Sequence, residues 1–195
     1  MEKKYKLTDE TINVDGRILH RIEALKDFGD VKKGDKGGFI EKEDNLSQNG
    51  NCWVYDNAKV YGNAKIYGNA VVFGNAEVFD SAVIYDNALV CDNVEVCNNA
   101  RIYGYGEVYN NAVVRDNAEV YGKARIFDDV EIYGNAEVYD KAEVCENAEV
   151  YGDAKIYGNA RVYCDTVVCD NAEVCGYSKI FGNAVIRDNT KVCDD

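Results

Sequence analysis

Residues 60–71 read VYGNAKIYGNAV, which is one six-residue unit written twice. Outward from this stretch, every sixth residue from Val54 to Val192 is valine or isoleucine, and these 24 positions follow one another without insertion or deletion. Four residues after each comes a small side chain, which is alanine at 17 of the 23 positions from Ala58 to Thr190. A period of six fits neither an α-helix nor an alternating strand, so we expect short strands separated by tight turns.

The turn residues lie between these two columns. Gly or Asp fills 20 of the 24 first turn positions, and Asn fills 15 of the 24 second positions. These residues tolerate left-handed backbone conformations, so the chain can turn every six residues. Three units make a triangular coil of 18 residues, in which each strand pairs in parallel with the strand one coil away at ~4.8 Å. The absence of proline agrees with interior strands that donate N–H groups to the next coil.

The direction of each column follows from the side chains it accepts. The Val/Ile and alanine columns are expected to line the interior. The column after Val/Ile holds 12 Tyr, 4 Phe, 6 Cys and 2 Arg, and it is expected to point outward because neighbouring strand residues alternate faces. One outward face stacks six tyrosines on successive coils, namely Tyr67, Tyr85, Tyr103, Tyr121, Tyr139 and Tyr157. This strip is predicted either to stabilise the coils by stacking or to form an oligomer or partner interface.

The unit Val60–Lys65 resembles the hexapeptide repeat of left-handed β-helix proteins, and the resemblance extends over about 140 residues. The left-handed coiling is implied by that resemblance. The fold class that follows is all-β: a single-stranded left-handed parallel β-helix of about eight triangular 18-residue coils over residues 51–195, with an N-terminal β-hairpin cap over residues 1–50. At ~4.8 Å per coil the rod is roughly 38 Å long.

The lead-in to the repeat has a narrower resemblance. This lead-in is similar to that of hexapeptide-repeat proteins encoded by phages and prophages. The similarity extends from Gly37–Glu41 through Asn45–Ser47 and into Asn51–Tyr55. Members of that group are described as transferases or as polymer-forming proteins. The resemblance implies a lineage and does not define a chemistry.

The first 50 residues are predicted to cap the rod. Tyr5–Val14 and Arg17–Leu25 flank Asp15-Gly16, which is a strong hairpin signal. A cap would cover the open ladder and the apolar end of the first coil, and partner binding by this small module is the alternative. No equivalent cap follows Val192, so self-association at that edge is a further hypothesis.

Catalytic chemistry is not expected. The resemblance to hexapeptide acyltransferases implies a catalytic histidine near a loop that interrupts the repeat, but the sole histidine is His20, in the predicted hairpin, and the repeat is unbroken. Carbonic anhydrases built on this fold bind metal through three histidines. We therefore expect no catalytic residue, no metal site and no cofactor, while an activity that uses only carboxylates or cysteine stays open.

The cysteines are expected to be reduced thiols in a cytoplasmic protein. The charged start MEKKYKLTDE has no apolar segment of a secretory signal, and no apolar run approaches the ~20 residues of a membrane span. Cys175 and Cys193 are 18 residues apart, so they would lie on neighbouring coils near disulfide range. If the protein is phage-encoded, the expected compartment is the host cytosol, without membrane contact.

The charge is strongly acidic, with 22 basic and 35 acidic residues and a net charge of −13. A protein that binds the nucleic-acid backbone directly would need a basic face, so direct nucleic-acid binding is not expected. One face places Glu77 beside Glu95 and Glu131 beside Glu149, with Asp80 and Asp116 at the adjoining corners. Like charges one coil apart oppose stability, which makes these six residues the candidate partner-binding site.

The functional prediction is a non-catalytic phage-type binding protein. Its acidic rod would engage a host protein with a basic surface, and could inhibit a nucleic-acid-binding or defence factor by charge mimicry. Two alternatives are kept: an acyltransferase-like hexapeptide enzyme, and a self-assembling structural rod. A homo-oligomer is expected. The charge could also serve only to keep a repetitive rod soluble.

Overall fold

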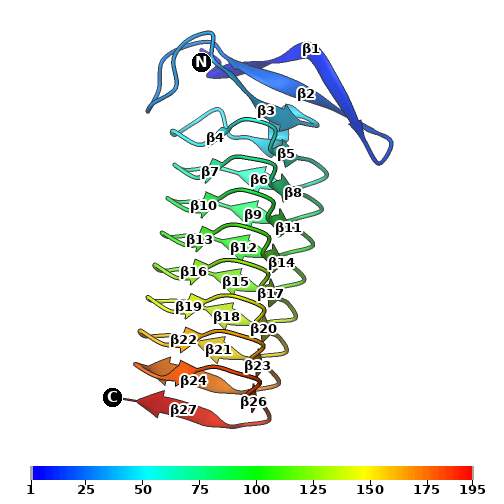
Figure 1. Cartoon of the computed structure of the whole chain (residues 1–195). Helices are drawn as coiled ribbons and strands as arrows, with labels where there is room; N and C mark the ends of the chain where they lie inside the picture. The colour runs from blue at the N-terminus through cyan, green and yellow to red at the C-terminus, as the bar shows by residue number, and fades with distance from the viewer. Residues whose placement is uncertain (1, 195) are drawn as a thin grey trace.

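The computed structural model describes residues 2–194, which form a three-sided solenoid whose strands are mostly two residues long (Figure 1). Sheet I contains β1 (Tyr5–Val14), β2 (Arg17–Ala24), β3 (Lys36–Ile40), β5 (Lys59–Val60), β8 (Glu77–Val78), β11 (Glu95–Val96), β14 (Val113–Val114), β17 (Glu131–Ile132), β20 (Glu149–Val150), β23 (Val167–Val168) and β26 (Val185–Ile186). Sheet II contains β6 (Lys65–Ile66), β9 (Val83–Ile84), β12 (Arg101–Ile102), β15 (Glu119–Val120), β18 (Glu137–Val138), β21 (Lys155–Ile156), β24 (Glu173–Gly176) and β27 (Lys191–Asp194). Sheet III contains β4 (Trp53–Val54), β7 (Val71–Val72), β10 (Leu89–Val90), β13 (Glu107–Val108), β16 (Arg125–Ile126), β19 (Glu143–Val144), β22 (Arg161–Val162) and β25 (Lys179–Ile180).

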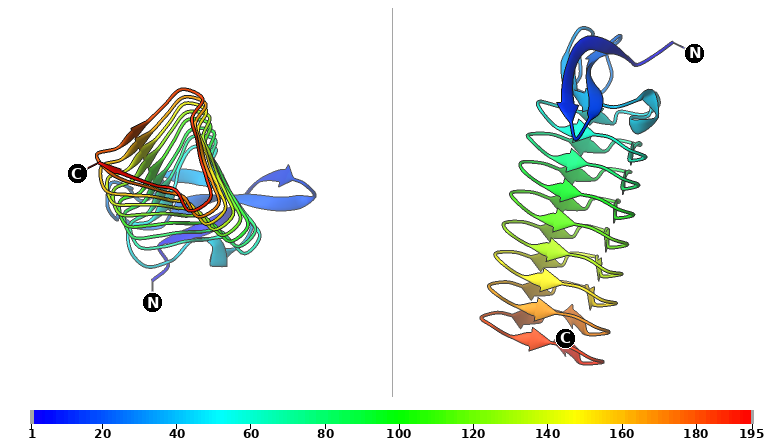
Figure 2. Two further views of the ribbon diagram at one scale, coloured as in Figure 1. Left: turned by 90° about the horizontal axis from the view of Figure 1, so that it is seen from below. Right: turned by 90° about the vertical axis from the view of Figure 1, so that its right-hand side faces the viewer.

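Each solenoid strand pairs in parallel with the strand 18 residues away, so the predicted coil is confirmed. Glu95 pairs with Glu77 and Val96 with Val78, and the same register repeats along all three sheets. The strands β4 to β27 make eight coils of three strands. With β3 and the bridge from Leu46 to Ile66 above them, the rod has about nine turns. Viewed along its axis, the rod has a triangular cross-section (Figure 2).

The core is the narrow interior of this triangle. The inner Val/Ile column is 0–1% exposed from Val54 to Val174, and the alanines beside it are equally buried. In the last coil, Ile180, Ile186 and Val192 are only half-buried. The two inner columns are therefore as predicted, and burial weakens towards the final turn.

The corners explain the Gly/Asp turn position. Residues there have positive φ, for example 57° at Asp80 and 58° at Asp86, which is the left-handed region. At eight corners an Asp carboxylate also accepts the backbone N–H of the residue one coil further on, as from Asn98 to Asp80 (3.4 Å) and from Gly104 to Asp86 (3.3 Å). These aspartates therefore link successive coils as well as turning the chain.

The second corner position forms side-chain ladders. Asn75 donates to Asn93 (3.2 Å), which donates to Asn111 (3.1 Å), and Asn99 donates to Asn117 (3.2 Å), in each case across one coil. Identical amides repeated along a parallel ladder satisfy one another, which explains why Asn predominates here.

The N-terminal segment covers the first coil as a hairpin, as predicted. β1 and β2 are antiparallel and join at Asp15-Gly16, and β2 pairs with β3, which continues sheet I onto β5. The hairpin projects sideways from the rod in Figure 1. The short 3-10 helix η1 (Glu43–Asn45) follows, and the Asn45 side chain donates to the Ala64 carbonyl at 2.9 Å.

Some outward-facing side chains are more buried than the alternation of faces predicts. Trp53 is fully buried because Tyr5 and Phe28 of the cap pack edge-on against its ring. In the column after Val/Ile, Cys91 and Cys97 are only 7% and 9% exposed, and Tyr61, Cys169 and Cys175 are also buried. A thiol is short, so bulkier neighbours in the adjoining columns and coils cover it.

Candidate functional site

The six predicted acidic residues all lie on sheet I or at the corner where it meets sheet II. Glu77 and Glu95 are register partners, as are Glu131 and Glu149. Asp80 and Asp116 occupy the same corner position two coils apart, with Asn98 between them. The structure therefore brings the predicted residues onto one side of the rod.

Part of this acidic group is neutralised within the rod. Lys59 pairs with Glu77 at 2.6 Å, and Arg115 pairs with Glu131 at 3.1 Å. Among residues 2–194, no Lys, Arg or His nitrogen lies within 4.0 Å of a carboxylate oxygen of Glu95 or Glu149. These two exposed glutamates are the free carboxylates of the predicted set on sheet I.

The acidic surface is larger than predicted. From β4 onward, sheet I and its two corners bear fifteen carboxylates and three cations, Lys59, Arg115 and Arg187. The carboxylates are Asp56, Glu77, Asp80, Asp92, Glu95, Asp116, Asp128, Asp129, Glu131, Glu146, Glu149, Asp153, Asp165, Asp170 and Asp188. We call this surface the acidic face. The described residues of sheets II and III and their shared corner, from β4 onward, bear eight carboxylates and nine cations.

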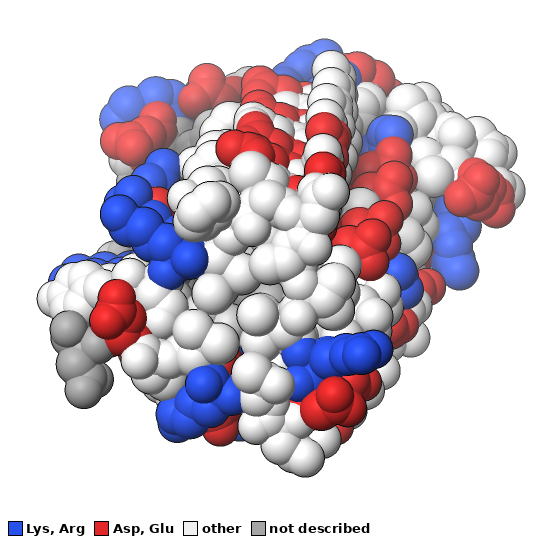
Figure 3. Space-filling view, turned by 60° about the horizontal axis from the view of Figure 1, so that its bottom comes forward, with Lys and Arg blue, Asp and Glu red and all other residues white. Residues whose placement is uncertain are grey.

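Sequence reasoning missed the contribution of the corner between sheets III and I, which adds Asp56, Asp92, Asp128, Asp129, Glu146 and Asp165. These residues could have been found from the sequence, because the 18-residue period assigns every corner residue to one of three edges. Figure 3 shows rows of Asp and Glu side chains that run along part of the rod's surface. Nearly all of the net charge is therefore segregated to one side of the triangle.

The six predicted tyrosines form one continuous stack on sheet II. Successive ring centroids from Tyr67 to Tyr157 are 4.8–5.0 Å apart, with interplanar angles of 3–14°. Tyr67 is 39% exposed, whereas the other five rings are half-buried. The stack therefore contributes contacts between coils, and its outer edge stays accessible.

The tyrosine hydroxyls are also engaged. Tyr103 donates to Glu119 at 2.7 Å and Tyr121 donates to Glu137 at 2.8 Å. The pKa of both hydroxyls is raised above the ordinary value, mainly by burial and secondly by these carboxylates. The glutamates thus hold the phenols in the protonated form and join neighbouring coils.

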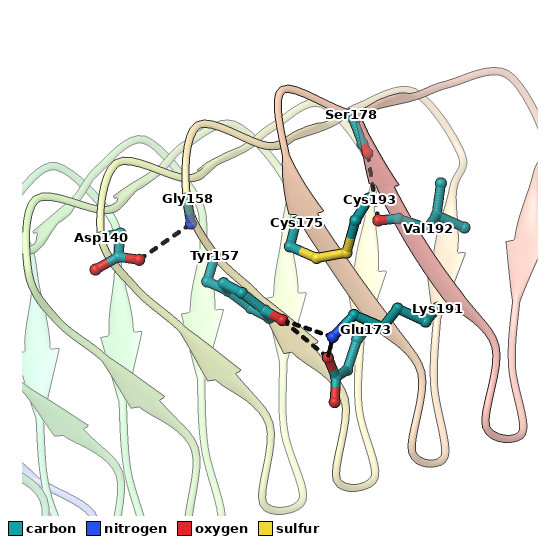
Figure 4. Close-up of a disulfide and its surroundings, with 9 residues drawn as sticks. All are labelled: Asp140, Tyr157, Gly158, Glu173, Cys175, Ser178, Lys191, Val192 and Cys193. Atoms are coloured by element: carbon teal, nitrogen blue, oxygen red, sulfur yellow. Dashed lines mark hydrogen bonds and ion pairs between the residues drawn. A yellow bond between two sulfur atoms is a disulfide. The ribbon is translucent and has the colours of Figure 1, made fainter. Parts of the chain in front are cut away.

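The tyrosine column ends in a disulfide, in contrast to the expectation of reduced thiols throughout. Cys175 of β24 and Cys193 of β27 are bonded, with Cα atoms 4.5 Å apart (Figure 4). The register of these two strands brings the side chains together. The six other cysteines are free, and burial raises the pKa of the Cys97 thiol to about 11.

His20 lies on β2 in the hairpin, where its Nδ1 is 3.0 Å from the Thr8 carbonyl of β1. It therefore lies in the hairpin, outside the repeat, as predicted. Across residues 2–194, no group of three or more His, Cys, Asp and Glu side chains is arranged to hold a metal ion. No helix in the same range is long and apolar enough to cross a membrane.

Comparison with known proteins gives the class of repeat. Residues 154–170 match the family described as YdcK β-solenoid repeat. The uncharacterized acetyltransferase YdcK of Escherichia coli (strain K12) is 42% identical over an alignment of 62 residues, which covers 28% of this chain and 19% of that protein. The chain thus contains a β-solenoid repeat similar to that of YdcK, and it spans about a fifth of that relative's length.

Proposed function

We propose that this protein is a non-catalytic binding protein whose acidic face engages a partner protein with a basic surface. The observation that carries the proposal is the charge segregation, with fifteen carboxylates and three cations on one side of the rod. If the acidic residues served only to keep the rod soluble, they would be expected on all three sides. Concentrated charge of one sign guides and orients a partner of opposite charge.

Nucleic-acid mimicry is the form of binding that this face favours. Its excess of twelve negative charges over roughly 38 Å is about one charge per 3 Å, against one per ~1.7 Å for duplex DNA. A basic nucleic-acid-binding protein would meet a rigid acidic surface of about half that density. The lead-in at Gly37–Glu41 supports a phage-encoded protein, so the proposed partner is a host protein that the rod inhibits.

The test uses two variants with matched chemistry. Asp80→Asn with Glu95→Gln removes two charges from the acidic face, and Asp86→Asn with Glu107→Gln removes two from the other sides. Asp80 and Asp86 each accept a backbone N–H from the next coil (3.4 and 3.3 Å), and Asn98 shows that this turn accepts asparagine. Glu107 also lies 3.5 Å from Arg125 in an exposed ion pair, which contributes little to stability, so both folds should be preserved.

The measurement is capture of host proteins on the immobilised rod at low and high salt, followed by titration of each retained protein. We expect the first variant to bind up to about thirtyfold more weakly, since an exposed charge pair is worth at most ~1 kcal/mol, and the second to bind like wild type. Equal loss in both variants, or no basic protein retained at low salt, would refute the proposal.

Acetyl transfer is the second candidate, favoured by the 62-residue match to a protein named as an acetyltransferase. It would have to use groups other than His20, which bonds Thr8 in the hairpin. Incubation with acetyl-CoA tests it through thermal stability and release of free coenzyme A. A stabilising shift together with acceptor-dependent release would support transfer, and no change in either would exclude this candidate.

A further inference from the structure

The corner between sheets II and III breaks the pattern of its second turn position. At the other two corners this position is always Asn, Asp or Ser. At this corner the ladder starts with Asn69 donating to Asn87 at 3.1 Å, but Tyr105, Lys123 and Lys141 replace the next three members. Tyr177 replaces the amide again after Asn159. All four Tyr and Lys residues at the second turn position therefore lie on one edge of the rod.

These substitutions oppose the stability of the stack. Lys123 and Lys141 occupy the same position on neighbouring coils, so two like charges replace a pair of hydrogen-bonded amides. Within residues 2–194, neither lysine has a carboxylate oxygen within 4.0 Å of Nζ, and the same is true of Lys179. Unpaired ammonium groups on an acidic rod are free to bind a ligand.

The same residues line two adjoining grooves. The first has a volume of about 470 Å³ and is bounded by Tyr105, Lys123, Lys141, Asp140 and Asn159. The second, of about 710 Å³, shares Asn159 and is lined by Arg161, Tyr177, Lys179 and Asp194. Together they follow the corner between sheets II and III over several coils, and this corner lies opposite sheet I in the three-sided rod.

Exposed aromatic rings stand at both ends of this path. Tyr105 is 59% exposed and Tyr177 is 64% exposed, unlike the half-buried tyrosines of the stack on sheet II. Asp140 lies between them, and its Oδ2 accepts the Gly158 N–H at 3.2 Å (Figure 4). The order along the edge is an aromatic ring, two cations, an amide and a second ring.

We propose that this edge binds an acidic oligosaccharide. The lysines would pair with carboxylates on successive sugars, since a sugar in an extended chain is about as long as one coil is high. The exposed tyrosine rings would stack on sugar faces, and Asp140 and Asn159 would accept hydrogen bonds from hydroxyl groups. A single-stranded nucleic acid fits less well, because it bears a phosphate at every unit and offers few hydroxyl donors to Asp140 and Asp194.

The first test is titration of the full chain with a short oligogalacturonate by calorimetry at low salt. The variant Lys123→Asn with Lys141→Asn restores the residue found at most second turn positions, so its thermal stability should equal or exceed that of wild type. Its affinity should fall by roughly tenfold or more, because it loses two charge-assisted hydrogen bonds. Lys33→Asn with Lys65→Asn makes the same change in net charge at exposed, unpaired lysines away from the grooves, and should bind like wild type.

A second variant separates ring stacking from charge. Tyr105→Asn should weaken binding while the dependence on salt stays unchanged. No binding by wild type, unchanged binding by the double lysine variant, or equal binding of a neutral oligosaccharide of the same linkage would overturn the proposal. Tighter binding of a single-stranded oligonucleotide would overturn it too. The acidic-face variant Asp80→Asn with Glu95→Gln should keep its oligosaccharide affinity, so failure here is distinguishable from failure of the proposed partner binding.

Discussion

At the scale of single residues, the inner column decides stability. Its side chains are all β-branched and are packed without exposure from the first coil to the seventh. Such residues suit a strand in which the side chain has one preferred rotamer. Because these side chains are fully enclosed, a shortened one leaves a cavity that neighbouring coils can only partly close.

The variant Ile132→Ala is expected to lower the free energy of unfolding by about 2–5 kcal/mol. Ile132 is fully buried in the middle of the rod, whereas Ile186 in the last coil is half-buried. The matched variant Ile186→Ala should therefore lose clearly less. Urea denaturation followed by circular dichroism measures both, and equal losses would contradict the burial argument.

The sequence predicts these inner positions because a column of 24 Val/Ile residues tolerates no polar side chain. It predicts the burial of outward-facing side chains less well. Alternation of faces places Cys97 outside, yet its neighbours cover it. Trp53 is buried by Tyr5 and Phe28, which come from a segment without periodicity. Burial of this kind depends on side-chain size in neighbouring columns and on where the cap lies.

At the scale of elements, the joint between the cap and the rod is the most crowded point. A Cβ atom at Gly38 would lie 2.5 Å from the Ala58 carbonyl oxygen and 2.7 Å from Cγ1 of Val54. Both partners belong to the first coil and cannot move without opening it. The paired glycines of β3 therefore allow the antiparallel hairpin to continue directly into a parallel ladder.

The variant Gly38→Ala is expected to loosen the cap. Amide hydrogen exchange should become faster in β2, β3 and β5, and the thermal midpoint should fall. Gly106→Ala is the control, because Gly106 occupies a position that is alanine in most units and its Cβ would lie 3.1 Å from the nearest atom. A comparable loss in Gly106→Ala, or unchanged exchange in the cap of Gly38→Ala, would refute the explanation.

At the scale of the whole molecule, the rod has two chemically different sides. The acidic face is continuous along the coils, while the opposite edge bears the unpaired lysines Lys123 and Lys141. The sequence predicted the six acidic residues and their pairing, because the 18-residue period fixes which residues are neighbours. It missed the second acidic corner and the groove, since both require every turn position to be assigned to one of three edges.

The stability of the whole rod is expected to fall above about pH 9. Burial raises the pKa of Cys145 to about 11 and that of Cys91 to about 12, and also raises the pKa of Tyr85 and Tyr139. The ordinary values are about 8.5 for a thiol and 10 for a phenol. The unfolded chain therefore loses these protons first, so stability is complete below the ordinary values and is lost as the pH rises towards the raised ones.

Urea titrations between about pH 7 and pH 11, with a reductant present, would measure this decline. The variant Cys91→Ala removes one of the shifted groups and should make the decline less steep. A free energy of unfolding that stays constant or increases over this range would contradict the assignment.

The core of the rod repeats every six residues, whereas its surface repeats every 18 residues, so insertions of different length affect the two differently. Inserting one whole coil would lengthen it by a single step and leave every later surface residue on its own side. Inserting one unit would keep each valine and alanine in the interior, yet every later residue would move round by one side, taking Glu131 and Glu149 from sheet I to sheet II. Such rods can therefore change in length by three units at a time without altering the arrangement of their surface. An insertion of one unit instead creates a new surface on an unchanged core.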